Sequence, residues 1–499
     1  MRKSQPYIGT TGMTKHVSTS ADGRTEILKY AGSENKEQLN KRLVGLASRE
    51  NNLSWLYNTF YIAKTNMEGL ANALSTLSHS ALQIGSTQDA CSVFLFSKEY
   101  KVSSADTAEA QDEAKKLEKD FNQVVWLTYR RNFIPIQPPS GYTSDTGWGC
   151  MLRSAQMIMA ETLQKHLGTA WRFESGAVSC EHKTLLRWFI DAPKVFSFYS
   201  IHRMAEFGRR YGKKAGEWYG PTTVAWVLRD LVEAHRSLER NSKGEDHLLL
   251  LSNGVQDLTM LVADNGTICV EDIKDACEEK LESSSDARAE EANDPLLHPG
   301  LDPVWTSALF LLVPVRLGLQ KINPDYLKAL SSVLKFPQCV GMIGGSPAHS
   351  LYFVGSQDSQ FLYLDPHTVH DAATDTECGD PRFPDETTVT TYHCSSLKFV
   401  PGQDIDPSLA IGFYCKSVKE FIDLRGRIGQ LAGPPFLSVV DKRPNYEYDF
   451  DIENERNSSD DDSDDGLVTA SEGEGEKGEP KRKKNVNTTN LEDEFVLLP

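Results

Sequence analysis

The spacing of apolar residues predicts helices in the first half of the folded region. Residues 107–125 show the period of an amphipathic helix. The segment Cys150–Ala160 contains no glycine or proline, and its apolar residues recur at helical spacing. Because this segment follows directly on the polar loop 143–149, we expect a helix that begins at Cys150. A further helix is expected over residues 323–334, where Asn-Pro is typical of a helix start.

In the second half the pattern changes to that of β-strands. Residues 305–315, which contain the apolar run 308–315, are typical of a buried strand, and residues 340–343 form a shorter run that ends at two glycines. Two more apolar runs, 350–355 and 360–365, flank a short polar turn and predict a β-hairpin. The order of these elements predicts an α+β fold, with helices first and a mostly antiparallel sheet after them.

Three polar segments lie outside this pattern. Residues 1–89 are polar and mixed and are interpreted as an N-terminal extension, and residues 280–298 are typical of an exposed insertion. Residues 426–499 form an acidic tail: its last 59 residues hold 18 Asp and Glu against 8 Lys and Arg. Such a composition predicts disorder. Residues 90–425 remain as the expected folded domain.

Composition and charge exclude several classes of function. The 499 residues carry a net charge of −17, which disfavours nucleic acid as a partner because phosphates require Lys and Arg. We expect neither a membrane span nor a signal peptide, since the apolar runs are too short. The nine cysteines are scattered without any Cys-x-x-Cys pair, which argues against disulfides or a zinc site and for the cytoplasm. No metal or other cofactor is expected.

Cys150 is the first candidate for chemistry. Thiol catalysis needs a thiolate, a base that moves a proton, and a group that orients the base. A helix N-terminus stabilises negative charge, and Cys150 stands at such a position. The glycine before it, Gly149, would allow a substrate to approach closely. Considered alone, however, a cysteine such as Cys150 is also compatible with a small buried core residue.

The segment Asp365-Pro366-His367 is the second candidate. On an extended strand residues i and i+2 point to the same face, so we expect the carboxylate of Asp365 beside the imidazole of His367. A carboxylate in this place fixes the imidazole tautomer and stabilises the imidazolium. His370 is a competing base three residues further on. A satisfied polar pair at a strand end is the alternative, so spacing alone leaves the catalytic set open.

Longer motifs around both candidates resemble those of one known family. Residues 143–153, with the sequence TSDTGWGCMLR, resemble the nucleophile signature of the autophagins, the autophagy-related cysteine proteases of papain-like fold. Residues 364–368, LDPHT, resemble their second signature. Further similar stretches are 127–133, 218–221, 313–319, 341–347, 392–394 and 406–415. The resemblance covers about residues 90–425 and implies a papain-like fold, with the nucleophile on a helical part and the Asp/His pair on the sheet.

The resemblance also implies the roles of four residues. Cys150 corresponds to the nucleophile, His367 to the general base and Asp365 to the residue that orients it. Tyr129 corresponds to a tyrosine whose hydroxyl donates a hydrogen bond to the oxyanion. The alternative for Tyr129 is a half-buried tyrosine without a catalytic role.

Four other residues correspond to parts of the family's substrate cleft. Trp218 corresponds to a tryptophan that caps the cleft, and Gly344, Gly345 and Pro347 correspond to a mobile loop that packs against it. Without the resemblance, the tryptophan would be a core residue and the glycines a plain turn. The chain departs from the family at Leu351, where members often carry an aromatic residue or histidine.

The resemblance implies a substrate as well. Autophagins trim the C-terminus of ubiquitin-like autophagy modifiers of the GABARAP kind to expose a glycine, and later cleave that glycine from phosphatidylethanolamine. Both reactions are acyl transfers from a glycyl carbonyl. For this chain the implied partners are therefore free and lipid-linked modifiers, with transient contact to a membrane surface through the substrate. A monomer is expected.

The end of the tail, EDEFVLLP, resembles a short motif that docks on such modifiers. An extended peptide would add a strand to the edge of the modifier's sheet, with Phe495 and Leu498 in two pockets. Two other functions stay open. A catalytically weak scaffold would bind modifiers through this tail alone, and a papain-like deubiquitinase would hydrolyse ubiquitin fusions instead.

Overall fold

The computed structural model describes residues 91–102, 108–136, 141–241, 254–278, 305–346, 349–374, 377 and 383–443. The expected N-terminal extension, the insertion at 280–298 and the docking motif at the end of the tail lie outside these residues.

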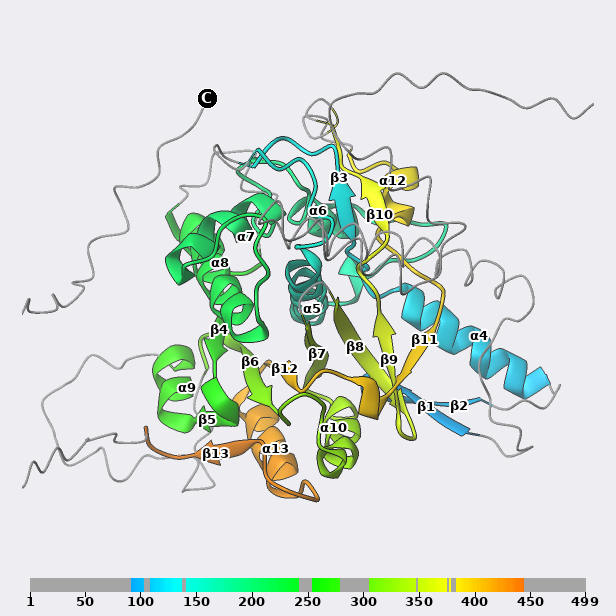
Figure 1. Ribbon diagram of the computed structural model, residues 1–499, viewed down its shortest axis with the longest axis vertical. Helices are drawn as coiled ribbons and strands as arrows, with labels where there is room; N and C mark the ends of the chain where they lie inside the picture. Colours follow the sequence, from blue (N-terminus) through cyan, green and yellow to red (C-terminus); the bar gives the residue numbers. More distant parts are fainter. Residues whose placement is uncertain are drawn as a thin grey trace, which may run out of the picture. The chain divides into compact units, whose positions relative to one another are not determined.

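A mixed, mostly antiparallel sheet of nine strands forms the centre of the described part of the chain (Figure 1). Along its main path the strand order is β11-β9-β8-β7-β12-β6-β4, and β1 joins it at β8 and carries β2. The pairing of β4 with β6 is parallel, and the other pairings are antiparallel. The strands are β1 (Cys91–Leu95), β2 (Lys98–Val102), β4 (Leu258–Val262), β6 (Ala308–Arg316), β7 (Cys339–Ser346), β8 (His349–Gln357), β9 (Gln360–Leu364), β11 (Lys398–Pro401) and β12 (Ser408–Cys415).

Helices pack on this sheet, and two short strand pairs lie beside it. Figure 1 shows α5 against β7 and β8, with α7 and α8 next to it. The helices are α4 (Ala108–Asn122), α5 (Cys150–Leu167), α6 (Cys180–Arg187), α7 (Ile201–Gly208), α8 (Pro221–Asn241), α9 (Val270–Cys277), α10 (Leu327–Leu334), α12 (Glu386–Thr390) and α13 (Val418–Gly429). The parallel pairs are β3 (Tyr129–Arg131) with β10 (Val369–Asp371), and β5 (Thr267–Cys269) with β13 (Ser438–Val440).

Strand β6 shows that the sheet is buried on both faces. Phe310 and Leu312 belong to the core cluster that contains α5 and α8. The alternate residues Leu309, Leu311 and Val313 belong to the second cluster, which contains α10 and α13. Because successive side chains of a strand point to opposite faces, an uninterrupted apolar run is what a doubly covered strand requires. The prediction of a buried strand here is confirmed.

The other predicted elements are confirmed with small shifts. The helix expected at 107–125 is α4, and the helix expected to begin at Cys150 does begin there. The helix at 323–334 consists of a 3-10 turn capped by the Asn323 side chain, followed by α10. The hairpin consists of β8 and β9.

The end of the folded domain lies further along than the expected residue 425. That residue is inside α13, and the described structure continues through β13 to residue 443. The reason is the apolar face of α13: Val418, Phe421, Leu424 and Ile428 are all buried. Acidic composition marks the tail only after this helix has completed its contacts with the sheet.

Two negative findings concern the described residues only. None of their helices is both long and apolar enough to cross a bilayer. The eight cysteines among them are all free thiols.

The position of α5 in the core generates a stability prediction. Ile158 is fully buried, and its side chain fills the space left by the missing side chain of Gly412 on β12. Ile158→Ala is expected to lower the free energy of unfolding by about 2–5 kcal/mol, because it leaves a cavity in a well-packed core. Ile422→Ala on α13 is the matched control: Ile422 is 45% exposed, and its loss should cost less than about 1 kcal/mol. Equal shifts of the urea unfolding midpoint in the two variants would contradict this account.

Candidate active site

Cys150 is the first residue of α5 and is completely buried. It follows Gly149, the N-cap residue of the helix. A side chain on Gly149 would be impossible without rearrangement, because its Cβ would lie 2.3 Å from Oδ2 of Asp145. The loop therefore needs glycine here to bring the Asp145 carboxylate against the start of the helix, and Cys150 benefits from the positive end of the helix dipole.

Asp365 and His367 lie in a turn that follows β9, which corrects the expectation that they share one face of an extended strand. Oδ1 of Asp365 accepts hydrogen bonds from the backbone N of His367 (3.1 Å) and from its Nδ1 (2.6 Å). Aspartate commonly closes a turn by accepting from the backbone two residues later. The two side chains are adjacent as expected, but the turn rather than the alternation of a strand brings them together.

Two further groups hold Asp365 in place. Its backbone carbonyl accepts a hydrogen bond from Trp126 Nε1 at 2.7 Å, and its Oδ2 accepts one from Lys398 Nζ at 3.4 Å. Burial alone would raise the pKa of the Asp365 carboxyl, but the hydrogen bonds from His367 and the charges of His367 and Lys398 hold it well below its usual range. Asp365 is therefore a carboxylate at neutral pH.

His367 connects this carboxylate to Cys150. Burial disfavours the imidazolium, but the hydrogen bonds and negative charges of Asp365 and Cys150 outweigh burial and raise the pKa of His367 to about 9. The fold thus brings a helix N-terminus from the first half of the domain to a turn from the second half. An imidazolium between a cysteine sulfur and a carboxylate is suited to thiol catalysis. The sulfur can attack as a thiolate, and the imidazolium can donate a proton.

Two aromatic rings flank His367. The ring of Tyr129 meets the imidazole edge-on, with ring centroids 5.4 Å apart, and Tyr129 is 1% exposed. The ring of His349 lies nearly parallel to the imidazole, with centroids 5.8 Å apart. Sequence reasoning missed His349, because the predicted hairpin began one residue later. The one feature of the sequence that could have indicated His349 is its place at the start of the strand that follows Gly344 and Gly345.

His370, the competing base, has other partners. Its Nδ1 lies 2.8 Å from Oγ1 of Thr128, and its ring packs edge-on against Trp126. Burial, helped by the charge of Arg130, lowers the pKa of His370 to about 4. His370 is thus a neutral residue on β10, whereas His367 pairs with Cys150.

The expected cleft residues are found in regular structure or just before it. Trp218 is half-buried and stands three residues before α8. Among the described residues its buried indole N–H has no hydrogen-bond partner. Gly344 and Gly345 lie within β7, opposite Leu351 and Ser350 of β8, so the strand predicted over 340–343 continues past them to Ser346. Pro347 lies outside the described residues.

In the residues that the structure describes, no group of three or more His, Cys, Asp or Glu side chains is arranged to hold a metal ion.

Comparison with known proteins agrees with this geometry. Residues 114–427, a span that includes Cys150 and the Asp365–His367 turn, match the model of the Peptidase C54 catalytic domain. The chain belongs to the Peptidase C54 family. The autophagin family and the papain-like fold predicted from the motifs are therefore confirmed, and the protein is a cysteine peptidase.

Several similar proteins are named as ATG4 cysteine proteases. The protein is 33% identical to cysteine protease ATG4B of Xenopus laevis, over 74% of this chain and 90% of that protein. It is 36% identical to cysteine protease ATG4 of Medicago truncatula, over 65% of this chain and 62% of that protein. It is 31% identical to cysteine protease ATG4C of Homo sapiens, over 61% and 69% of the two chains. These similarities make it an autophagy-related cysteine protease.

The raised pKa of His367 predicts the alkaline limb of the pH profile. The imidazolium is present below about pH 9 and is lost as the pH rises through that value, so turnover should fall there. Asp365→Asn removes the main group that raises this pKa, and should move the limb to lower pH while reducing kcat by about 100-fold or more. Asp371→Asn on β10 is the control, since Asp371 pairs with the exposed Arg131. A limb that stays near pH 9 in Asp365→Asn would contradict the assignment.

Proposed function

We propose that this peptidase trims the C-terminus of GABARAP-like ubiquitin-like modifiers to expose a glycine, and that it also cleaves this glycine from phosphatidylethanolamine. The observation that carries the proposal is the set of buried Cys150 and His367 with the half-buried Asp365 in a chain of the Peptidase C54 family. In this proposal Cys150 is the nucleophile, His367 moves the proton and Asp365 orients the imidazole.

The chemical steps follow from these roles. The Cys150 thiolate attacks the glycyl carbonyl, and the negative charge that develops on the carbonyl oxygen accepts a hydrogen bond from the hydroxyl of Tyr129. The imidazolium of His367 then donates its proton to the departing amine, which leaves a thioester on Cys150. In the second half, His367 takes a proton from water, and the resulting hydroxide releases the glycine carboxylate and the thiol.

One site is able to serve both reactions because the leaving groups are alike. In trimming, the leaving group is the backbone amine of the residue after the glycine. In release from the lipid, it is the amine of ethanolamine. Each has the same acyl group and the same kind of nitrogen, so the same proton donor, His367, suits both.

The burial of the site supports a glycine at the cleaved bond. Cys150 has no exposed surface and His367 is 7% exposed, so a substrate must enter a narrow cleft. A peptide without side chains needs the least space. We assign the opening of the cleft to Trp218, whose indole N–H is not held by a hydrogen bond within the described residues, together with Gly344 and Gly345 near the end of β7 and Pro347 after it.

The proposal includes partners and location. A lipid-linked modifier would bring the enzyme to a membrane surface only for the duration of a reaction, and the enzyme itself would be a cytoplasmic monomer. Phe495 and Leu498, at the end of the acidic tail, would dock on the modifier and raise its local concentration at the active site.

Cys150→Ala is expected to abolish cleavage of a GABARAP-like precursor with a C-terminal extension, while binding of the precursor persists. Cys180→Ala is the matched control, because Cys180 also begins a helix but is exposed. This variant should retain activity. Cleavage followed by gel electrophoresis, with ubiquitin fusions in parallel, separates the alternatives. Retained turnover in Cys150→Ala would refute the nucleophile, inactivity of the native chain would favour the scaffold, and faster cleavage of ubiquitin fusions would favour a deubiquitinase.

Phe495→Ala is expected to weaken binding of the modifier by about tenfold without slowing the hydrolysis of short glycyl substrates, because the aromatic anchor of a docking peptide supplies much of its affinity. Phe450→Ala, a substitution elsewhere in the tail, should leave binding unchanged. Titration by calorimetry measures both. Equal affinities of the native chain and Phe495→Ala would remove the docking role.

A further inference from the structure

A buried ion cluster lies at the point where the nucleophile loop, residues 143–149, enters α5. Arg153, in the first turn of α5, pairs with Asp145 through Nε–Oδ2 (2.8 Å) and Nη2–Oδ1 (3.0 Å). The same guanidinium pairs with Asp191 through Nη1–Oδ1 (3.1 Å) and Nη2–Oδ2 (2.9 Å). The three side chains are 3% exposed or less. Two carboxyl groups share one guanidinium in the core, and burial raises the pKa of Asp145 although the charge of Arg153 opposes this.

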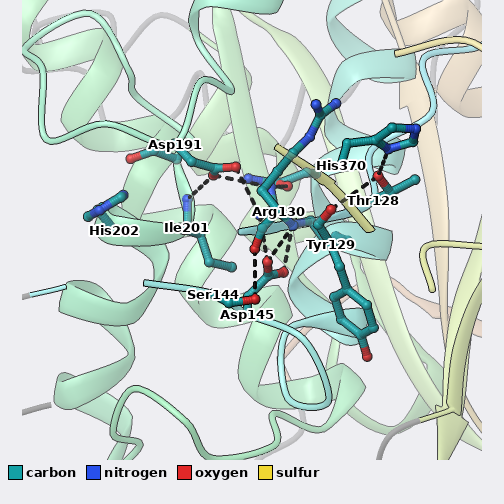
Figure 2. Close-up of polar contacts among 12 residues, drawn as sticks. Thr128, Tyr129, Arg130, Ser144, Asp145, Asp191, Ile201, His202 and His370 are labelled. Carbon is teal, nitrogen blue, oxygen red and sulfur yellow. Dashed lines mark hydrogen bonds and ion pairs between the residues drawn. The ribbon is translucent and has the colours of Figure 1, made fainter. Parts of the chain in front are cut away.

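Asp145 has a second contact that explains its place. Its Oδ1 also accepts a hydrogen bond from the backbone N of Arg130 on β3, at 2.7 Å, and Figure 2 shows this carboxylate close to the Arg130 backbone with Ser144 beside it. The carbonyl of Arg130 accepts hydrogen bonds from Oγ of Ser144 (3.0 Å) and from the backbone N of Asp145 (3.3 Å). Two consecutive residues of the nucleophile loop therefore hold both polar backbone groups of Arg130.

Strand β3 also connects the nucleophile loop to the turn that contains His367. Tyr129 precedes Arg130, and its backbone N donates to the carbonyl of Pro366 at 2.9 Å. Pro366 stands between Asp365 and His367. One edge of β3 is thus bonded to the loop before Cys150, and the backbone of Tyr129 is bonded to the turn that carries the imidazole.

We infer that Asp145, held by Arg153, is a positioning residue that sets the location of the Tyr129 hydroxyl relative to the sulfur of Cys150. The inference rests on the proposed function, since it takes Tyr129 to contact the developing oxyanion. Asp145 itself touches no reacting atom. A donor that is displaced by about 1 Å from its productive place can cost about 100-fold in rate, so a rigid link between nucleophile and donor has a large effect.

Asp191 provides a matched comparison on the other side of Arg153. It is as buried as Asp145 and pairs with the same guanidinium. Its Oδ1 accepts from the backbone N of Ile201, at the start of α7, at 3.2 Å. Loss of either carboxylate disturbs the same cluster, but only loss of Asp145 removes the acceptor of the Arg130 backbone N–H on β3.

The test compares Asp145→Asn with Asp191→Asn in the full-length chain, acting on a GABARAP-like precursor. Asparagine has nearly the same shape as aspartate, but its NH2 group cannot accept a hydrogen bond. This group must face either Arg153 or the backbone N–H that the carboxylate held, so one of these hydrogen bonds is lost. With active sites counted by thiol titration, Asp145→Asn should lower kcat by about 100-fold and change KM by less than about threefold. Asp191→Asn should keep kcat within about threefold at a comparable loss of melting temperature.

Two more variants distinguish positioning from a general loss of structure. In a Tyr129→Phe background, Asp145→Asn should cost less than about fivefold in kcat, because the hydroxyl that it positions is already absent. Arg153→Lys keeps the charge but loses the two-point pairing, and should lower kcat by about tenfold. If Asp145→Asn does not fold, Arg153→Lys and Asp191→Asn carry the comparison.

Equal losses of kcat in Asp145→Asn and Asp191→Asn would overturn the inference. So would an undiminished 100-fold loss in the Tyr129→Phe background, or an unchanged kcat in Arg153→Lys. These outcomes differ from failure of the proposed function, which would appear as a native chain that does not cleave the precursor.

Discussion

The proposed chemistry depends on keeping a positive imidazole in a buried site. Burial disfavours the charge on His367, and only the Asp365 carboxylate on one side and the Cys150 sulfur on the other make it stable. Each of these neighbours comes from a different half of the domain. The fold therefore has to hold the start of a helix and a distant turn next to each other.

The sheet and its two covered faces meet the requirement through rigidity. α5 packs on β7 and β8 (Figure 1), so the helix that bears Cys150 has a fixed position relative to these strands. The Asp365–His367 turn extends directly from β9. Cys150 and His367 are thus both held by packed elements, a helix and the end of a strand. This suits a reaction in which the reacting groups tolerate little displacement from their positions.

The local pattern of apolar and polar residues predicted the helices and strands well. It did not predict ion pairs between residues that are far apart in the sequence. The start of α5 was predictable because a polar loop meets an apolar run without glycine or proline. The closeness of Asp365 and His367 was predicted for the wrong reason, since a side-chain-closed turn and an extended strand both bring residues i and i+2 near each other. The pairing of Arg153 with Asp191, 38 positions apart, left no trace in composition or spacing. The ring contact of His349 with His367 depends on how a hairpin starts, which periodicity does not define.

The complete burial of Cys150 has a consequence for selectivity. A reactive sulfur that opened freely to solvent would be available to any passing peptide, peroxide or electrophile. In this structure the Cys150 sulfur is covered by the protein. A substrate therefore has to displace the covering residues before it can reach the sulfur and be hydrolysed. Substrates are thereby selected by whether they can enter the site, before any bond is broken.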